Sequence, residues 1–277
     1  MHIEKADEAE ITRAIVRSYM AELDSLIETD VIIAGGGPAG CVAARKLAEK
    51  GFKVAIFERN LKPGGGMYVG GMLMNKLVVE APAERLLLEA GVKTLKEYRP
   101  GLFVADAPEV ATKLVAAALD AGAKMLNAVE IVDVIHKDKR ITGVVANWHA
   151  VSALPKFITC VDPLAFKSKV VIDATGHQAE IANVAAKKIG FAIKSGEGPM
   201  DVDRAEQACV EHTKEIYPSL VVCGMAANSA FGQPRMGPIF GAMFLSGEKA
   251  AEIAEGILAS QGKPAKHGEI KEAVQGR

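Results

Sequence analysis

The sequence predicts a doubly wound α/β fold with a mainly parallel sheet, an inserted antiparallel β element and an N-terminal helix. Two observations carry this prediction. The apolar runs at residues 30–34 and 167–176 each end at a glycine, where the chain can turn, as buried strands do at the carboxyl edge of such a sheet. The first run is followed by a helical pattern and another apolar run, which together make a βαβ unit.

The first predicted element is the N-terminal helical segment, residues 1–28. Ile11, Ile15, Tyr19 and Leu23 recur every fourth residue between charged positions. This spacing places them on one face of a helix, so we expect the stripe to pack on a later part of the chain.

The βαβ unit comes next. DVIIAGGGPAGCVAARKLAEKG predicts a strand at residues 30–34, a glycine turn and a helix that ends at Gly51. KVAIFER predicts a second strand at residues 53–59. We expect the ends of the strands at 30–34 and 167–176 to lie at the same sheet edge, where α/β proteins bind ligands.

The remaining elements follow from similar patterns. We expect a helix at residues 107–121 and paired strands at 123–136 and 141–150, joined by a polar DKR turn. SLVVCGMAA predicts a final strand, followed by a Gly/Pro loop and a helix over residues 241–258. Residues 262–277 are expected to be a solvated end. No repeat of fixed period is present, so residues 1–277 are predicted to form a single catalytic domain.

Composition narrows the class of partner. The 277 residues are 49% hydrophobic and 24% charged, with 33 Lys and Arg against 34 Asp and Glu. This balance argues against binding to nucleic acid or to an anionic membrane and favours small molecules. The acidic N-terminus lacks the pattern of a signal peptide, and Ile216–Pro234 contains helix breakers. The four cysteines form no CxxC pair, so we expect a reducing, cytoplasmic location.

A glycine motif marks a dinucleotide site. Gly35, Gly37 and Gly40 form GxGxxG between a predicted strand and a predicted helix, where backbone amides can hold a pyrophosphate in a Rossmann-like fold. Glu58 ends the second strand, where a carboxylate accepts ribose hydroxyls. NAD or FAD is therefore favoured over NADP, although Arg59 could meet a phosphate. The alternative is a glycine turn needed only for close packing of helix and strand.

A second glycine run, Pro63–Met67, is either a ligand-approaching segment or a plain loop. Together with DATG at residues 173–176, the glycine motifs resemble the glutathione-reductase-like flavoprotein superfamily. Three features differ from that superfamily: Gly224 is followed by Met225 rather than Asp, and both a CxxC pair and a second GxGxxG are missing. These differences disfavour a flavoenzyme that shuttles hydride.

Several further segments resemble the thiamine thiazole synthase family over nearly the whole chain. They are EITRAIVRSYMAEL, DVIIAGGGPAG, FERNLKPGGGMYVGG, TCVDPL, DATGH and GMAANSAFGQPRMGPIFGAMFLSG. The resemblance implies a transferase-type, iron-dependent enzyme of thiamine biosynthesis. NAD would lose nicotinamide, glycine would condense with the exposed sugar, and sulfur would be added to give an ADP-linked thiazole carboxylate.

The resemblance also implies roles for individual residues. Asp162 and His177 would hold Fe(II) from neighbouring subunits of a homo-oligomer, commonly an octamer. Arg235 would bind the carboxylate of glycine, and Met225 would lie beside the intermediate. The adenosine diphosphate part would contact Ala39, Glu58, Arg59, Gly66 and Val129, and the wider nucleotide site would include Gly35, Gly37, Gly40, Cys160, Val161 and Asp162.

The residue types fit these roles, and each also has a simpler interpretation. Aspartate and histidine are ligands that suit Fe(II) or Zn(II), and two of them leave coordination positions open. His177 could instead cap the ATG turn, and Asp162 could be a turn residue before Pro163. The geometry of the Arg235 guanidinium matches that of a carboxylate. Without the resemblance, the simpler interpretation is that Arg235 is an arginine at the protein surface.

Cys160 decides the sulfur chemistry that the resemblance implies. Members with a cysteine at this position give up its sulfur in a single turnover, and members with a histidine use free sulfide catalytically. A thiolate near a divalent metal has a lowered pKa, which makes donation plausible. Cys160 could also lie in the site without donating. The other cysteines, Cys41, Cys209 and Cys223, fit small buried hydrophobic residues better.

Two other functions stay open at the level of sequence. One is an FAD-dependent oxidoreductase of the same superfamily, which would purify with a flavin spectrum. The other is a non-catalytic oligomer that binds NAD or iron.

Overall fold

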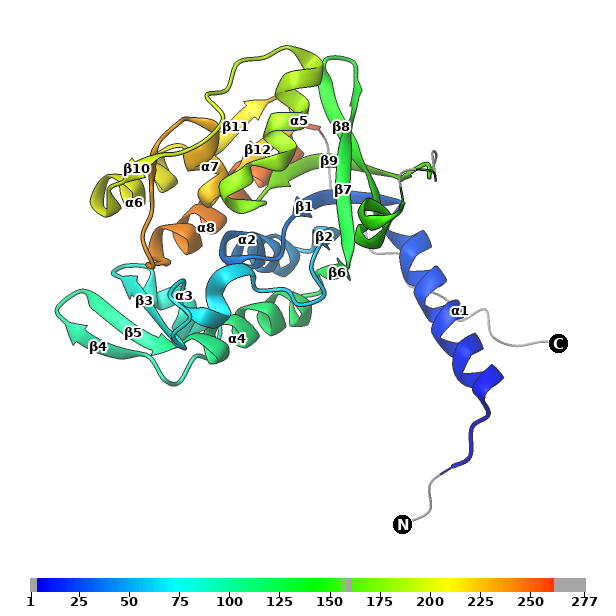
Figure 1. Cartoon of the computed structure of the whole chain (residues 1–277), viewed down its shortest axis with the longest axis horizontal. Helices are drawn as coiled ribbons and strands as arrows, with labels where there is room; N and C mark the ends of the chain where they lie inside the picture. The colour runs from blue at the N-terminus through cyan, green and yellow to red at the C-terminus, as the bar shows by residue number, and fades with distance from the viewer. Residues whose placement is uncertain (1–3, 156, 158–160, 262–277) are drawn as a thin grey trace.

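A mainly parallel sheet forms the centre of the molecule (Figure 1). The computed structural model describes residues 4–155, 157 and 161–261. The strand order is β11 (Lys214–Tyr217), β12 (Leu220–Val222), β9 (Leu164–Asp173), β1 (Glu28–Ala34), β2 (Val54–Glu58) and β6 (Lys124–Asn127). All neighbours from β12 to β6 are parallel, and β11 is antiparallel. The predicted doubly wound α/β fold is confirmed.

The carboxyl ends of three strands meet at one edge of this sheet. Ala34 at the end of β1 is paired with Phe57 of β2 and with Asp173 of β9. The two glycine turns that follow β1 and β9 therefore lie side by side, as the apolar runs predicted. This edge carries the candidate site described below.

The two faces of the sheet have separate cores because side chains alternate along each strand. Val31 and Ile33 of β1 pack in a cluster with α2 (Pro38–Glu49) and α8 (Gly241–Gln261). Ile32 and Ala34 pack on the opposite face, in a cluster that includes α5 (Glu180–Ile189) and the β7–β8 hairpin.

The inserted antiparallel element is the hairpin of β7 (Val129–Lys137) and β8 (Arg140–Trp148), and β8 also pairs with the first half of β9. The expectation of one continuous strand over residues 123–136 was wrong. Ala128 has φ +58°, a left-handed conformation that ends β6 and starts β7. Hydrogen bonds from Ala128 N to Asn60 O (3.1 Å) and from His149 N to Ala128 O (2.8 Å) hold this corner. After β8 the chain forms η2 (His149–Ala153) rather than more strand.

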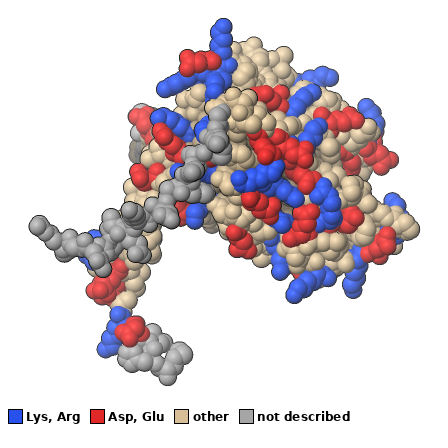
Figure 2. Space-filling model, turned by 180° about the vertical axis from the view of Figure 1, so that it is seen from behind, with Lys and Arg blue, Asp and Glu red and all other residues tan. Residues whose placement is uncertain are grey.

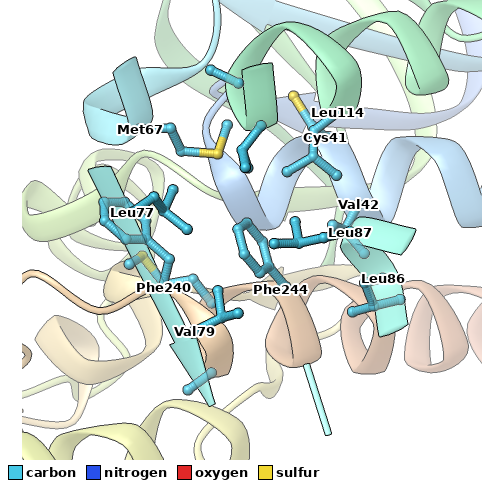
Figure 3. Packing of buried hydrophobic residues seen from close by; sticks show 14 of the residues in the cluster. Cys41, Val42, Met67, Leu77, Val79, Leu86, Leu87, Leu114, Phe240 and Phe244 are labelled. Carbon is cyan, nitrogen blue, oxygen red and sulfur yellow. The ribbon is translucent and has the colours of Figure 1, made fainter. Parts of the chain in front are cut away.

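A second antiparallel sheet was not predicted. It consists of β3 (Lys76–Glu80), β5 (Leu102–Asp106) and β4 (Lys96–Arg99), with η1 (Gly65–Val69), α3 (Glu84–Glu89) and α4 (Ala107–Asp120) beside it. Figure 3 shows Leu77 and Val79 of β3 packed with Phe240 and with Phe244 of α8. α4 confirms the helix expected at residues 107–121.

The last third differs from the prediction at one point. The strand expected from SLVVCGMAA covers only β12, because Gly224 (φ +61°) redirects the chain and Met225–Ala230 form helix α7. The other elements of this part are η3 (Gly176–Gln178), β10 (Gly198–Met200), α6 (Val202–Glu211) and β13 (Pro234–Arg235). The expected solvated end, 262–277, lies outside the described residues.

Helix α1 (Glu8–Leu26) begins at a capping box formed by Asp7 and Glu10. The predicted helix is confirmed, but its predicted packing is only partly so. Leu23 is buried, whereas Ile11 and Ile15 are 52% and 64% exposed, and Figure 1 shows α1 extending away from the sheet. The stripe therefore lacks a partner over its first turns within the described part of the chain.

The surface agrees with the balanced composition. Figure 2 shows Lys and Arg side chains interspersed with Asp and Glu over one face of the molecule. Among the helices that the structure describes, none combines the length and apolarity needed to cross a membrane.

Candidate functional site

A cavity of about 710 Å³ lies at the carboxyl ends of β1, β2 and β9. Its walls come from both glycine runs, the end of β2, the start of β7, the turn after β9 and the start of α7. The site residues predicted from the sequence that line it are Gly35, Gly37, Ala39, Glu58, Arg59, Gly66, Val129, His177, Met225 and Arg235. The fold thus brings most of the predicted site together from segments up to two hundred residues apart.

The two glycine runs form one wall of the cavity. Gly37 is the N-cap of α2, and a side chain added there would meet no atom within 4 Å. The first backbone amides of α2 are therefore accessible to an anionic group. Gly64 N donates to Gly36 O at 2.7 Å, which brings Gly65 against Gly37. This contact favours close ligand approach over a plain loop for the second run.

Gly40 lies beneath this wall rather than on it. A Cβ atom added there would lie 2.1 Å from Gly35 O, so the glycine is required for the close approach of helix and turn. Its contribution to the site is structural, and the packing interpretation of the motif holds for this position.

Glu58 connects the end of β2 to the glycine turn. Glu58 is only 4% exposed; its Oε2 accepts from Gly36 N at 2.9 Å, and its Oε1 accepts from Asn60 N and Nδ2 at 2.8 Å. Arg59 forms an ion pair with Glu180 at the start of α5. The arginine that could have met a phosphate therefore already has a carboxylate partner, a contact that sequence reasoning missed across 121 residues.

The turn after β9 carries His177. Buried Asp173 fixes this turn: Oδ1 accepts from Thr175 N (3.0 Å) and Oγ1 (2.6 Å), and Oδ2 accepts from Ala182 N (2.8 Å). Burial raises the pKa of Asp173, while these hydrogen bonds favour its charged form. His177 is half-exposed beside the cavity, with Nδ1 2.9 Å from both carboxylate oxygens of Glu197.

Asp162 and His177 lie at opposite ends of β9. Asp162 precedes the strand, and His177 follows it. At about 3.3 Å per residue, the strand separates the two by roughly 30 Å. Metal–ligand bonds are about 2 Å long, so the two residues of one chain cannot hold the same ion. No group of three His, Cys, Asp or Glu side chains with metal-binding geometry occurs within the described residues.

Arg235 and Met225 enter the cavity from the C-terminal third. Arg235 lies on β13, paired with Met200 of β10, and both residues line the cavity. In the described part of the chain, no acidic group forms an ion pair with its guanidinium. Met225 starts α7 directly after Gly224. The site therefore offers an unpaired cation beside an apolar side chain.

The cysteines separate into two groups. Cys41, Cys209 and Cys223 are fully buried, which confirms the packing role expected for them. Burial, together with the charge of Glu58, raises the pKa of Cys41 to about 12, and burial raises the pKa of the other two thiols as well. None of these three thiols has thiolate character near neutral pH. Cys160 lies outside the described residues, and Val161 next to it is exposed before β9.

Comparison with known proteins then decides the family. Residues 12–240 match the family model described as the Thi4 family. The chain belongs to the Thi4 family. The thiamine thiazole synthases of Aeropyrum pernix and Methanosarcina barkeri are 46% and 48% identical to it over 249 and 254 residues. These alignments cover 90% of this chain and 92% and 96% of the two relatives.

A solved Thi4 structure supports the fold independently. The crystal structure of Thermovibrio ammonificans THI4 matches with a TM-score of 0.87 at 41% identity, and covers 94% of this chain and 100% of its own. The resemblance to thiamine thiazole synthases that the sequence motifs indicated is confirmed, and the Thi4 cavity described above coincides with most of the residues that those motifs named.

Proposed function

We propose that this chain is a thiamine thiazole synthase that converts NAD, glycine and a sulfur source into an ADP-linked thiazole carboxylate and releases nicotinamide. One observation carries the proposal. A single cavity at the carboxyl edge of the sheet joins a dinucleotide-type glycine turn to His177 and Arg235 in a member of the Thi4 family.

The dinucleotide would lie along the glycine wall. Its pyrophosphate would accept hydrogen bonds from the amides at the start of α2, above the open space at Gly37. The ribose of its adenosine half would approach Glu58, with Val129 and Gly66 beside it. The carboxylate of Glu58 opposes an added 2′-phosphate, and Arg59, which could offset it, is already paired with Glu180, so NAD is favoured over NADP.

The reacting end would lie between Arg235 and His177. Arg235 would bind the carboxylate of glycine through two parallel N–H bonds, and Met225 would exclude water beside the intermediate. His177 fits a metal ligand, because Glu197 occupies Nδ1 and Nε2 makes no hydrogen bond within the described residues. Fe(II) bound there would supply a Lewis acid with open coordination positions. The oxygen ligand would be Asp162 of a second copy, since the strand separates the two residues in one chain.

The sulfur source is Cys160 or free sulfide, and mass spectrometry distinguishes them. Protein purified without oxygen would be incubated with NAD, glycine and Fe(II), with and without sulfide. Loss of the mass of H2S at Cys160, matched to one thiazole per chain without sulfide, establishes a sulfur donor. An intact Cys160 with sulfide-dependent multiple turnover establishes a catalyst. Absence of any thiazole product under all conditions contradicts the proposed function.

A further inference from the structure

Glu197 is the carboxylate partner of the His177 ring. Both of its carboxylate oxygens lie 2.9 Å from His177 Nδ1. The Glu197 side chain is 10% exposed and the His177 side chain 49%. Within the described residues, His177 is the only hydrogen-bond partner of this carboxylate. A largely buried carboxylate with a single partner costs solvation free energy, so the contact requires an explanation.

The segment that carries Glu197 is held in place by its backbone. Lys194 N donates to Ala230 O at 2.9 Å, and Gly198 N donates to Gln233 O at 2.9 Å. Between them, Gly196 N donates to Ser229 Oγ at 3.3 Å. Glu197 is thereby tied to the end of α7 and to the stretch that leads into Arg235.

The two partners reach each other from separate, rigid turns. The β9–α5 turn is held by the buried carboxylate of Asp173, and the Glu197 segment is held by α7. These contacts fix the two backbones, and the contact between His177 Nδ1 and the Glu197 carboxylate holds the ring between them. The geometry therefore sets the direction of the imidazole ring beside the cavity.

A carboxylate at Nδ1 also selects one tautomer. In the neutral ring the carboxylate accepts the proton of Nδ1–H, so Nε2 is the unprotonated nitrogen, which is the form of histidine that binds a metal. Sequence reasoning missed this residue because it follows His177 by 20 positions. The only local signal is an acidic residue between two glycines, Gly196 and Gly198.

We propose that Glu197 is a positioning residue that holds His177 in the Nδ1-protonated tautomer and orients Nε2 to bind a divalent cation at the cavity. The inference rests on the proposed function, because that function assigns the metal to His177. It adds a residue that acts only through the histidine and touches no substrate.

Cobalt(II) provides a test that does not depend on turnover. The full-length protein would be titrated with Co(II) and glycine without oxygen, and the affinity and the visible absorption of the bound ion recorded. We expect Glu197→Ala to weaken Co(II) binding by about 10- to 100-fold, the usual effect of losing a carboxylate behind a metal-binding histidine. Glu197→Gln should weaken binding less, because its amide oxygen still accepts from Nδ1–H.

Nitrogen-15 spectra of the metal-free protein give a second readout. In the wild type the His177 signals should show a protonated Nδ1 and an unprotonated Nε2. Glu197→Ala should change the ratio of the Nδ1-protonated to the Nε2-protonated tautomer. Glu130→Gln is the matched control, because Glu130 lines the same cavity and contacts His149 Nδ1 at 2.8 Å. It removes one negative charge from the cavity wall without touching His177, so Co(II) affinity should stay unchanged.

The possible outcomes distinguish the positioning role of Glu197 from the metal-binding role of His177. If His177→Ala abolishes Co(II) binding while Glu197→Ala binds Co(II) with wild-type affinity and spectrum, Glu197 has no positioning role and the metal site stands. If His177→Ala binds Co(II) as well as the wild type, the metal assignment itself fails and the inference fails with it. Equal weakening by Glu130→Gln would assign the effect to charge alone and overturn the inference.

Discussion

Gly37 and Gly40 belong to the same glycine turn, yet an added side chain would meet different surroundings at each. At Gly37 it would enter the open cavity, where φ is −80° and the backbone accepts any residue. At Gly40 it would lie 2.1 Å from Gly35 O. One position is therefore shaped for a ligand and the other for the packing of α2 on the turn.

This difference predicts that a substitution at Gly37 affects ligand binding and a substitution at Gly40 affects stability. Gly37→Val should abolish NAD binding with little change in the thermal midpoint of unfolding, because its side chain fills the space over the α2 amides. Gly40→Ala should lower the free energy of unfolding by about 1–3 kcal/mol, since turn and helix must move apart. Calorimetric titration and thermal unfolding measure the two effects. Wild-type NAD affinity in Gly37→Val would refute the placement of the pyrophosphate.

Arg235 provides a second test at the scale of a residue. Arg235→Ala should raise the glycine concentration needed for half-maximal thiazole formation by roughly 10- to 100-fold. This factor corresponds to the free energy of a charge-assisted hydrogen bond. Arg235→Lys should recover only part of the loss, because an ammonium lacks the planar fork. An unaltered glycine titration in both variants would make Arg235 a surface residue.

Three elements meet at a pair of half-buried glutamates, Glu80 and Glu206. Glu80 of β3 lies against the start of α8, and Glu206 of α6 accepts from Ala242 N at 3.0 Å. Burial and the adjoining carboxyl of Glu80 raise the pKa of Glu206 to about 9. Glu206 therefore joins α6 to the start of α8, where Glu80 of the second antiparallel sheet also lies.

This pair predicts how stability depends on pH. Because the folded pKa of Glu206 lies above its unfolded value of about 4.3, its contribution is full below that value and is lost as pH rises toward 9. Glu206→Gln keeps the acceptor for Ala242 but cannot ionise. Relative to the wild type, the variant should gain more than about 1 kcal/mol of unfolding free energy between pH 5.5 and 8.5. Urea unfolding at both pH values measures this; parallel curves would contradict it.

In the folded chain Asp162 and His177 lie at opposite ends of β9, and Ile11 and Ile15 of the apolar stripe of α1 are exposed. A site that uses both residues must therefore combine two copies of the chain, as the family resemblance implied. In the proposed metal site each copy would then depend on its neighbour, because one chain alone does not bring Asp162 and His177 together.

Mixing two inactive variants tests this arrangement. Asp162→Ala and His177→Ala should each lose iron-dependent thiazole formation. After subunit exchange at equal amounts, about one quarter of the sites should contain an intact aspartate and an intact histidine. Thiazole yield and native mass spectrometry of the mixed oligomers measure recovery. Mixed oligomers without any activity would place both residues in one subunit or outside the site.

The sequence predicted what depends on local pattern. Apolar runs ending at glycines predicted the parallel strands and their common edge, because the hydrophobicity of a strand and the residues of a turn can be identified from neighbouring positions in the sequence. The sequence also predicted Gly37 and Glu58 as members of one site through motif spacing, whereas the site roles of His177 and Arg235 followed from the family resemblance. It did not predict the corner at Ala128 or the short strands of the second sheet, where backbone conformation is set by contacts to distant segments.

By itself, then, the sequence determined the fold class, the family and a set of site residues, most of which line the cavity. Only the tertiary structure decided how those residues are held. It paired Arg59 with Glu180, placed Glu197 behind His177 and put Asp162 at the far end of β9. The physical reason is that carboxylate contacts across 20 to 121 residues leave no periodic signal, since they depend on where rigid strands and turns bring side chains together.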